Sequence, residues 1–113
     1  MHPDTALDAL VAPLRADVVS GAAVVARTAA EVMRRAAARL PAESVEELRW
    51  ALADVSSRVL DAQPAMAPLV HLVRDVMAAL EPVESVEDAR AAAREAAAAF
   101  RASLEARAEA VAE

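Results

Sequence analysis

The sequence contains no cysteine, no lysine and no tyrosine, and it has only one glycine, one tryptophan and one phenylalanine. Without cysteine, the chain cannot form a disulfide or use a thiolate as a nucleophile or metal ligand. It also lacks a Walker phosphate loop, a pair of histidines at ligand spacing and a convincing Ser/His/Asp set. We therefore expect no catalytic residue, no metal and no cofactor in this chain.

Charge and hydropathy narrow the range of partners. The 12 basic residues, all arginine, face 18 acidic ones, and the net charge of −6 argues against general nucleic-acid binding. No apolar run is long enough to span a membrane, and the N-terminus lacks the basic start and apolar core of a secretion signal. These features predict a cytoplasmic protein that binds neither nucleic acid nor membrane.

Apolar residues recur at helical spacing along almost the whole chain, which predicts an all-α fold. We expect a single domain, bundle-like, with five helices, the first from Thr5 to Val18 and the second from Gly21 to Leu40. The third begins after Ser44, the fourth runs to Leu80, and a long C-terminal helix follows Ser85. Prolines separate several helices, and Pro13 interrupts the first.

Two serines begin helices in a pattern typical of N-terminal capping boxes. Ser44 precedes Glu47 by three residues, and Ser85 begins the last helix. The third helix should bury a regular apolar stripe, and the fourth a broader one. The predicted stripe of the third helix comprises Val45, Leu48, Leu52, Val55 and Val59. That of the fourth comprises Met66, Leu69, Val70, Val73, Val76, Met77 and Leu80.

The only glycine, Gly21, lies where the first helix pattern stops and the second begins. A lone glycine in an alanine-rich chain suggests either a close contact that excludes a side chain or a positive φ. Ser20 could cap the second helix, and free amides at a helix start can also bind an anion. From the local pattern alone, a plain tight helix–helix corner is the favoured interpretation.

Trp50 falls on the opposite face of the third helix from Leu48. It is either covered by another helix of the same domain or an anchor for a partner. His71, one turn before Asp75, is interpreted as part of a solvated surface pair rather than as a poised histidine. The arginines on the outer face of the second helix are interpreted as a solvated face. They are Arg27, Arg34, Arg35 and Arg39, with Glu31 among them.

Two segments resemble, in order, the two N-terminal motifs of the translation initiation factor 2B alpha/beta/delta family. The first is residues 17–22 (Asp-Val-Val-Ser-Gly-Ala), and the second is residues 63–70 (Gln-Pro-Ala-Met-Ala-Pro-Leu-Val) followed by 72–76. Residues 100–104 (Phe-Arg-Ala-Ser-Leu) also fit. The resemblance implies that residues 1–113 form the family's N-terminal helical domain, without the α/β catalytic domain that would follow Glu113.

The family includes ribose-1,5-bisphosphate isomerase and methylthioribose-1-phosphate isomerase, whose motifs read Arg-Gly-Ala and Arg-Pro-Thr. Both arginines hold substrate phosphate there, whereas this chain has Ser20 and Gln63 at the matching places and lacks the catalytic cysteine. The resemblance leaves Ser20, Gly21, Ala22 and Gln63 as a residual phosphate-binding position. We expect no sugar-phosphate ligand and no isomerase activity from this chain alone.

The sequence therefore favours a non-catalytic helical binding or structural domain. It would dock on an α/β domain in cis or in trans, or on a second copy of itself, with Trp50 as the interface candidate. Two alternatives stay open: the chain is the substrate-covering half of a sugar-phosphate isomerase, or it is an unrelated helical bundle that dimerises.

Overall fold

The structure, a computed structural model, describes residues 9–12, 21–63 and 66–112. These ranges contain four long helices, α2 (Ala22–Arg39), α3 (Val45–Ala62), α4 (Ala67–Ala79) and α5 (Val86–Ala112), and no strand. A short helical segment at residues 9–12 precedes them. The all-α fold and the long C-terminal helix are thus confirmed. Most of the helix predicted from Thr5 to Val18, including Pro13, lies outside the described residues.

The helix starts follow the local sequence closely. Ser44 Oγ accepts the Glu47 N–H at 3.1 Å, and Ser85 Oγ accepts the Asp88 N–H at 3.1 Å, so both predicted serine caps are present. The Glu47 carboxylate, however, accepts the N–H of Glu43 at 2.7 Å instead of that of Ser44. The capping box is therefore confirmed on its serine side and displaced by one residue on its glutamate side.

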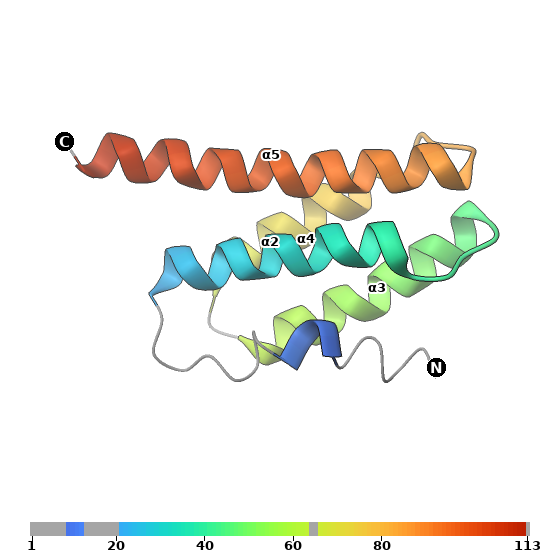
Figure 1. Ribbon diagram of the computed structural model, residues 1–113, viewed down its shortest axis with the longest axis horizontal. Coiled ribbons are helices and arrows are strands. Elements are labelled where there is room, and N and C mark those ends of the chain that lie inside the picture. Colours follow the sequence, from blue (N-terminus) through green and yellow to red (C-terminus); the bar gives the residue numbers. More distant parts are fainter. Residues whose placement is uncertain (1–8, 13–20, 64–65, 113) are drawn as a thin grey trace.

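Helix α2 packs against α3, α4 and α5, and its most extensive contact is with α5. Figure 1 shows α2 and α5 side by side and antiparallel, with α3 and α4 on the other sides of α2. Helices α2 and α4 begin at the same end of the molecule, and α3 and α5 begin at the opposite end. The two ends therefore differ in which helix termini they expose.

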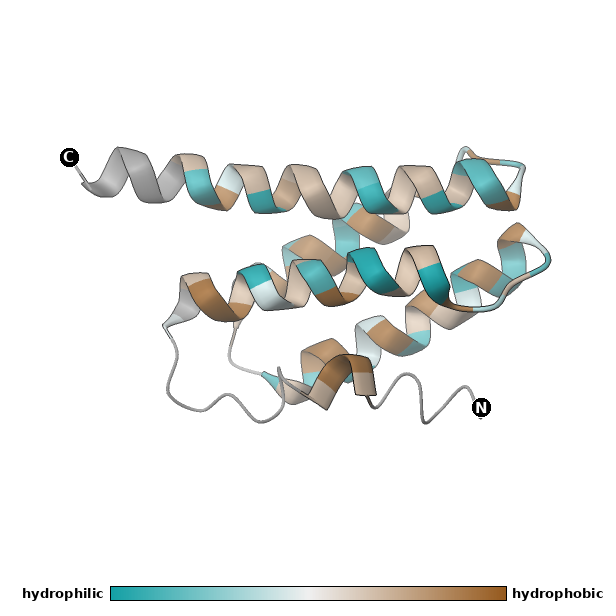
Figure 2. Cartoon of the chain, viewed as in Figure 1, coloured by the Kyte–Doolittle hydropathy of each residue, from teal (hydrophilic) through white to brown (hydrophobic). Residues whose placement is uncertain are grey.

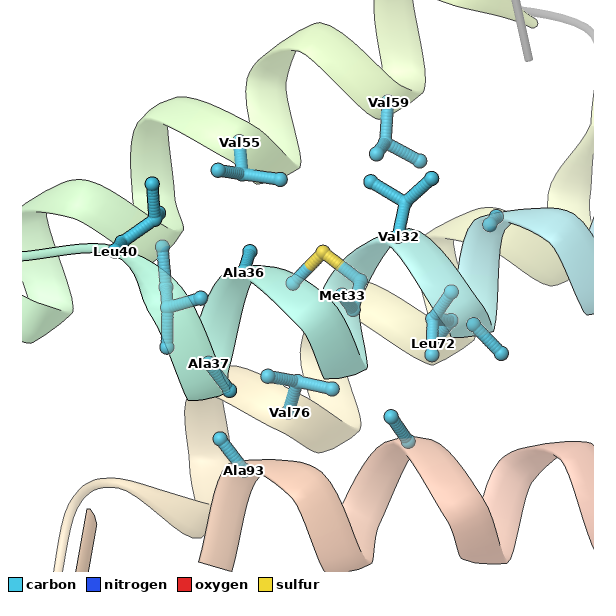
Figure 3. Close-up of a cluster of buried hydrophobic side chains, with 14 of the residues drawn as sticks. Val32, Met33, Ala36, Ala37, Leu40, Val55, Val59, Leu72, Val76 and Ala93 are labelled. Carbon is cyan, nitrogen blue, oxygen red and sulfur yellow. The ribbon is translucent and has the colours of Figure 1, made fainter. Parts of the chain in front are cut away.

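The core combines a few large side chains with many alanines. Met33 is fully buried in the middle of α2, where side chains of α3, α4 and α5 surround it (Figure 3). The α2–α5 contact is lined by small residues, which let the two backbones approach closely. These residues include Ala30 on α2 and Ala97 on α5, which line the groove between the two helices.

The predicted buried stripe of α3 is confirmed in full, and that of α4 is corrected. On α4 the fully buried residues are Leu69, Leu72 and Val76, whereas Val70 is 55% exposed and Val73 is only partly buried. Apolar residues cover a broad arc of residues 69–80, opposite His71, Arg74 and Asp75, so helical periodicity alone does not decide which residues of that arc are buried. The packing of α4 against α2, α3 and α5 makes the choice.

Two arginines bind the ends of neighbouring helices. Arg49 of α3 donates from Nη2 to the carbonyl oxygens of Leu80 and Glu81 at 2.8 and 3.1 Å, beyond the end of α4. Arg90 of α5 donates from Nη1 to the Ala37 oxygen of α2 at 3.0 Å. Both cations bind carbonyl groups at a helix C-terminus, where intrahelical N–H partners run out and the helix dipole also favours positive charge.

The outer surface is mixed in character. Figure 2 shows hydrophilic residues alternating with weakly hydrophobic ones along the visible sides of α2 and α5. Across the described part of the chain, no helix combines the length and the apolar character needed to cross a bilayer.

Candidate functional site

Gly21 is the N-cap of α2 and has φ −69° and ψ 166°, which is ordinary extended backbone. A Cβ built on it meets nothing within 4 Å, so neither of the reasons predicted for this glycine, a positive φ or a close contact, is correct. Its carbonyl accepts the N–H groups of Val24 and Val25 at 3.1 Å each, which begins the helix. Gly21 leaves α2 without a side-chain cap.

The start of α4 is similar. Its N-cap, Met66, makes no side-chain cap, and Pro68 occupies the first turn, where a missing N–H costs no helix bond. Gln63, half-buried at the end of α3, accepts the Met66 N–H on its carbonyl at 3.2 Å. The starts of α2 and α4 therefore lack the serine caps that α3 and α5 have at the other end.

This end of the molecule contains the positions that the resemblance assigns to phosphate. Gly21 and Gln63 belong to it, Ser20 lies outside the described residues, and the side chain of Ala22 is not described. Uncapped helix starts offer free N–H groups and a partial positive charge to an anion. Gln63 brings an amide in place of the bidentate guanidinium with which the isomerases hold phosphate.

Two arginines on the outer face of α2, Arg34 and Arg35, form an ion-pair network around Glu31. Its carboxylate accepts bonds from Arg34 Nε at 2.9 Å, Arg34 Nη2 at 2.5 Å and Arg35 Nε at 3.0 Å. Arg101 of α5 brings a further guanidinium to 4.0 Å, beside a groove of about 370 Å³ between α2 and α5. The guanidiniums of Arg34 and Arg35 are thus directed at a carboxylate of their own helix.

The hydrogen bond from Arg34 is the main reason why the pKa of Glu31 falls from 4.5 to about 2. Because the folded state lowers this pKa, the ionised carboxylate stabilises the fold above about pH 4.5, and this contribution is lost as the pH falls towards 2. Glu31 is therefore a structural anion, unsuited to accept a proton near neutral pH.

His71 and Asp75 lie beside a groove of about 620 Å³ between α4 and α5, which Phe100 and Leu104 also line. His71 Nδ1 lies 2.8 Å from Arg74 Nη2, and Arg74 Nε lies 3.9 Å from Asp75 Oδ1. Because a guanidinium only donates, His71 Nδ1 must accept this bond. The exposed histidine is thus bonded to Arg74 rather than poised by Asp75. Among the described residues, no group of three His, Asp or Glu side chains could hold a metal ion.

Trp50 is 70% exposed on the outer face of α3. The possibility that another helix of this domain covers it is therefore wrong for the part of the chain that the structure describes. Its neighbours one helical turn away, three or four residues along the chain, are all exposed as well. They are Glu46, Glu47, Ala53 and Asp54. An exposed indole on an acidic helix face is the most unusual feature of the surface.

A comparison with protein-family models matches residues 18–113 to the Initiation factor 2 subunit family. The chain belongs to this family. The match includes residues 18–22 of the first segment that carries the resemblance and all of the second, with Gly21, Gln63 and Trp50 inside it. No curated protein and no solved structure gives a significant match to the chain. Membership of the Initiation factor 2 subunit family is thus supported by the family model and by the residues already described.

The sequence did not predict several contacts that arginine side chains make between helices. Nothing in the local pattern pointed to Arg49 or Arg90 as partners of distant carbonyls, or to Arg101 as the third cation near Glu31. The charge of α3 gives one indication: Arg49 and Arg58 are its only two cations, and they occur among several acids.

Proposed function

We propose that this chain corresponds to the N-terminal helical domain of the Initiation factor 2 subunit family and acts as a non-catalytic binding domain in the cytoplasm. It docks on an α/β domain, either in the same protein or in a partner. The observation that carries the proposal is the exposure of Trp50, since large aromatic side chains are frequent anchors of protein interfaces. Burial of the indole against a partner would remove a large apolar surface from water.

The chemistry of the described residues supports the proposal that this domain is non-catalytic. The most strongly shifted carboxyl, Glu31, is held ionised by Arg34 and Arg35. The exposed His71 is hydrogen-bonded to Arg74 rather than to a nucleophile or a carboxylate of the described residues. General acid–base catalysis needs a group whose pKa lies near the operating pH and which reaches a substrate proton, and Glu31 does not meet the first condition.

The proposal is tested by placing a photo-crosslinking amino acid at position 50 and irradiating cells of the source organism that express the chain. We expect a discrete adduct whose partner, identified by mass spectrometry, contains an α/β domain. The same amino acid at position 95 serves as the control, because Glu95 is exposed on α5. Absence of an adduct from position 50, or the same adducts from both positions, would contradict docking through Trp50. An adduct of doubled mass would identify a second copy as the partner instead.

One observation favours the alternative in which the chain is the substrate-covering half of a sugar-phosphate isomerase. The starts of α2 and α4 lie at the same end of the molecule and lack side-chain caps within the described residues. Such an end could face the phosphate of a substrate held mainly by another domain. This alternative predicts measurable affinity for a sugar phosphate, which separates it from the binding-domain proposal.

A further inference from the structure

We infer that the partner surface covering Trp50 is basic and places an arginine or lysine side chain over the indole ring. This inference rests on the docking role proposed above and adds the chemistry of the partner. It follows from the charges around Trp50 and from the contacts that the neighbouring arginines already make.

Three of the four residues one turn from Trp50 on α3 are acidic, namely Glu46, Glu47 and Asp54, and the fourth is Ala53. Glu46 makes no ion pair with any residue that the structure describes, so its carboxylate is available to a partner. Glu47 accepts the Glu43 N–H, which leaves its negative charge in place. Asp54 Oδ1 lies 3.5 Å from Arg58 Nε, and it is the only one of the three with a cation near it among the described residues.

The two arginines of α3 pair with only one carboxylate of this face, that of Asp54. Arg49, adjacent to Trp50, uses its Nη2 for the carbonyls of Leu80 and Glu81 beyond α4. Arg58 lies one turn beyond Asp54, and only a quarter of its side chain is exposed. The exposed part of the face therefore presents an indole and carboxylates.

A basic partner matches this arrangement in two ways. A guanidinium or ammonium group over the face of a tryptophan is attracted by the ring's quadrupole, and tryptophan is the best side chain for this interaction. The surrounding carboxylates can pair with the same or neighbouring cations and attract the partner during approach. A purely apolar partner would instead remove the Glu46 carboxylate, which has no ion pair, from water without compensation.

A second copy of this chain fits less well. Each copy has a net charge of −6, and a twofold contact through Trp50 would bring the two acidic faces together. Of the four arginines of α2, Arg34 and Arg35 already pair with Glu31. The charges thus favour a different protein, or a different domain, with a cationic surface.

The intrinsic fluorescence of the protein tests this directly, because Trp50 is its only tryptophan and it has no tyrosine. The probe is a blocked peptide of alternating arginine and alanine, titrated at physiological salt. The control peptide has citrulline in place of arginine, which keeps the size and hydrogen bonding but removes the charge. We expect a saturable change in fluorescence with the arginine peptide and none with the citrulline peptide.

Two matched variants separate a local contact from general attraction to an acidic protein. Glu46→Gln should weaken peptide binding by about two- to fivefold, the range for losing one exposed charge pair. Glu95→Gln removes an exposed acid from α5 and should leave binding unchanged. Equal losses in the two variants, or no fluorescence change in the native protein, would overturn the inference. If position 50 still cross-links to an α/β domain while the arginine peptide does not bind, docking stands and the basic partner is wrong.

Discussion

At the scale of single residues, Gly21 and Trp50 are each the only residue of their type, but only Trp50 has an unusual environment. Gly21 is the only glycine, yet its backbone angles are open to any residue and the space around its Cα is free. Trp50 is the only tryptophan, and its exposed position does set it apart from the buried apolar residues. The difference is physical, because an exposed indole keeps a large apolar area in water, whereas a glycine in an extended conformation costs the fold little.

Replacing Gly21 with serine should stabilise the domain. Serine adds a hydroxyl that can accept an N–H of the first turn of α2, and the structure leaves room for its side chain. We expect a gain of a few tenths of a kcal/mol in the free energy of unfolding, measured by urea denaturation. As a control, Ala38→Ser, at an exposed position near the other end of α2, should cost a few tenths of a kcal/mol. If Gly21 were strained or tightly packed, Gly21→Ser would instead lose about 1–3 kcal/mol.

At the scale of elements, α4 shows where a periodic pattern no longer predicts which residues are buried. The polar residues of α3 leave only one apolar side, so its buried stripe follows from the sequence. In α4 apolar residues occur on several sides, and Val70 and Leu72 look equally suited to the core. Only the contacts with α2, α3 and α5 place Leu72 inside and Val70 outside.

The two positions should respond very differently to the loss of their side chains. Leu72→Ala removes a fully buried side chain and should lower the free energy of unfolding by about 2–5 kcal/mol. Val70→Ala, on the same helix, should change it by less than about 0.5 kcal/mol because Val70 is mostly exposed. Urea or thermal unfolding of both variants provides the measurement. Similar losses in the two proteins would show that the face of α4 is assigned incorrectly.

At the scale of the whole molecule, the arrangement of helix ends and the net charge act in opposite directions on anions. The starts of α2 and α4 face one end of the bundle and each carries about half a unit of positive charge. The chain as a whole has a charge of −6, and glutamine stands at position 63 where the isomerases have arginine. Helix starts at exposed sites contribute only about 0.3–1 kcal/mol to binding an anion.

We therefore expect no heat of binding when ribose-1,5-bisphosphate or methylthioribose-1-phosphate is titrated into the protein in a calorimeter at physiological salt. The double variant Ser20→Arg/Gln63→Arg should gain affinity for both compounds, because it restores two cationic forks. Ala38→Arg with Ala53→Arg adds the same charge at two other exposed positions and should not gain it. Micromolar binding by the native chain that is lost on changing Gly21 would place the isomerase alternative first.

The sequence by itself determined the features that depend on neighbours along the chain. Among them are the all-α fold, the serine caps at Ser44 and Ser85 and the stripe of α3. These features depend on contacts within one or two helical turns, where the separation of two residues along the chain sets whether they lie on the same face. Membership of the Initiation factor 2 subunit family likewise rests on the order of residues. Only the tertiary structure decided the buried face of α4 and the distant partners of Arg49 and Arg90. It also decided the exposure of Trp50, because periodicity places a side chain on a face but does not say which other helix, if any, packs against that face.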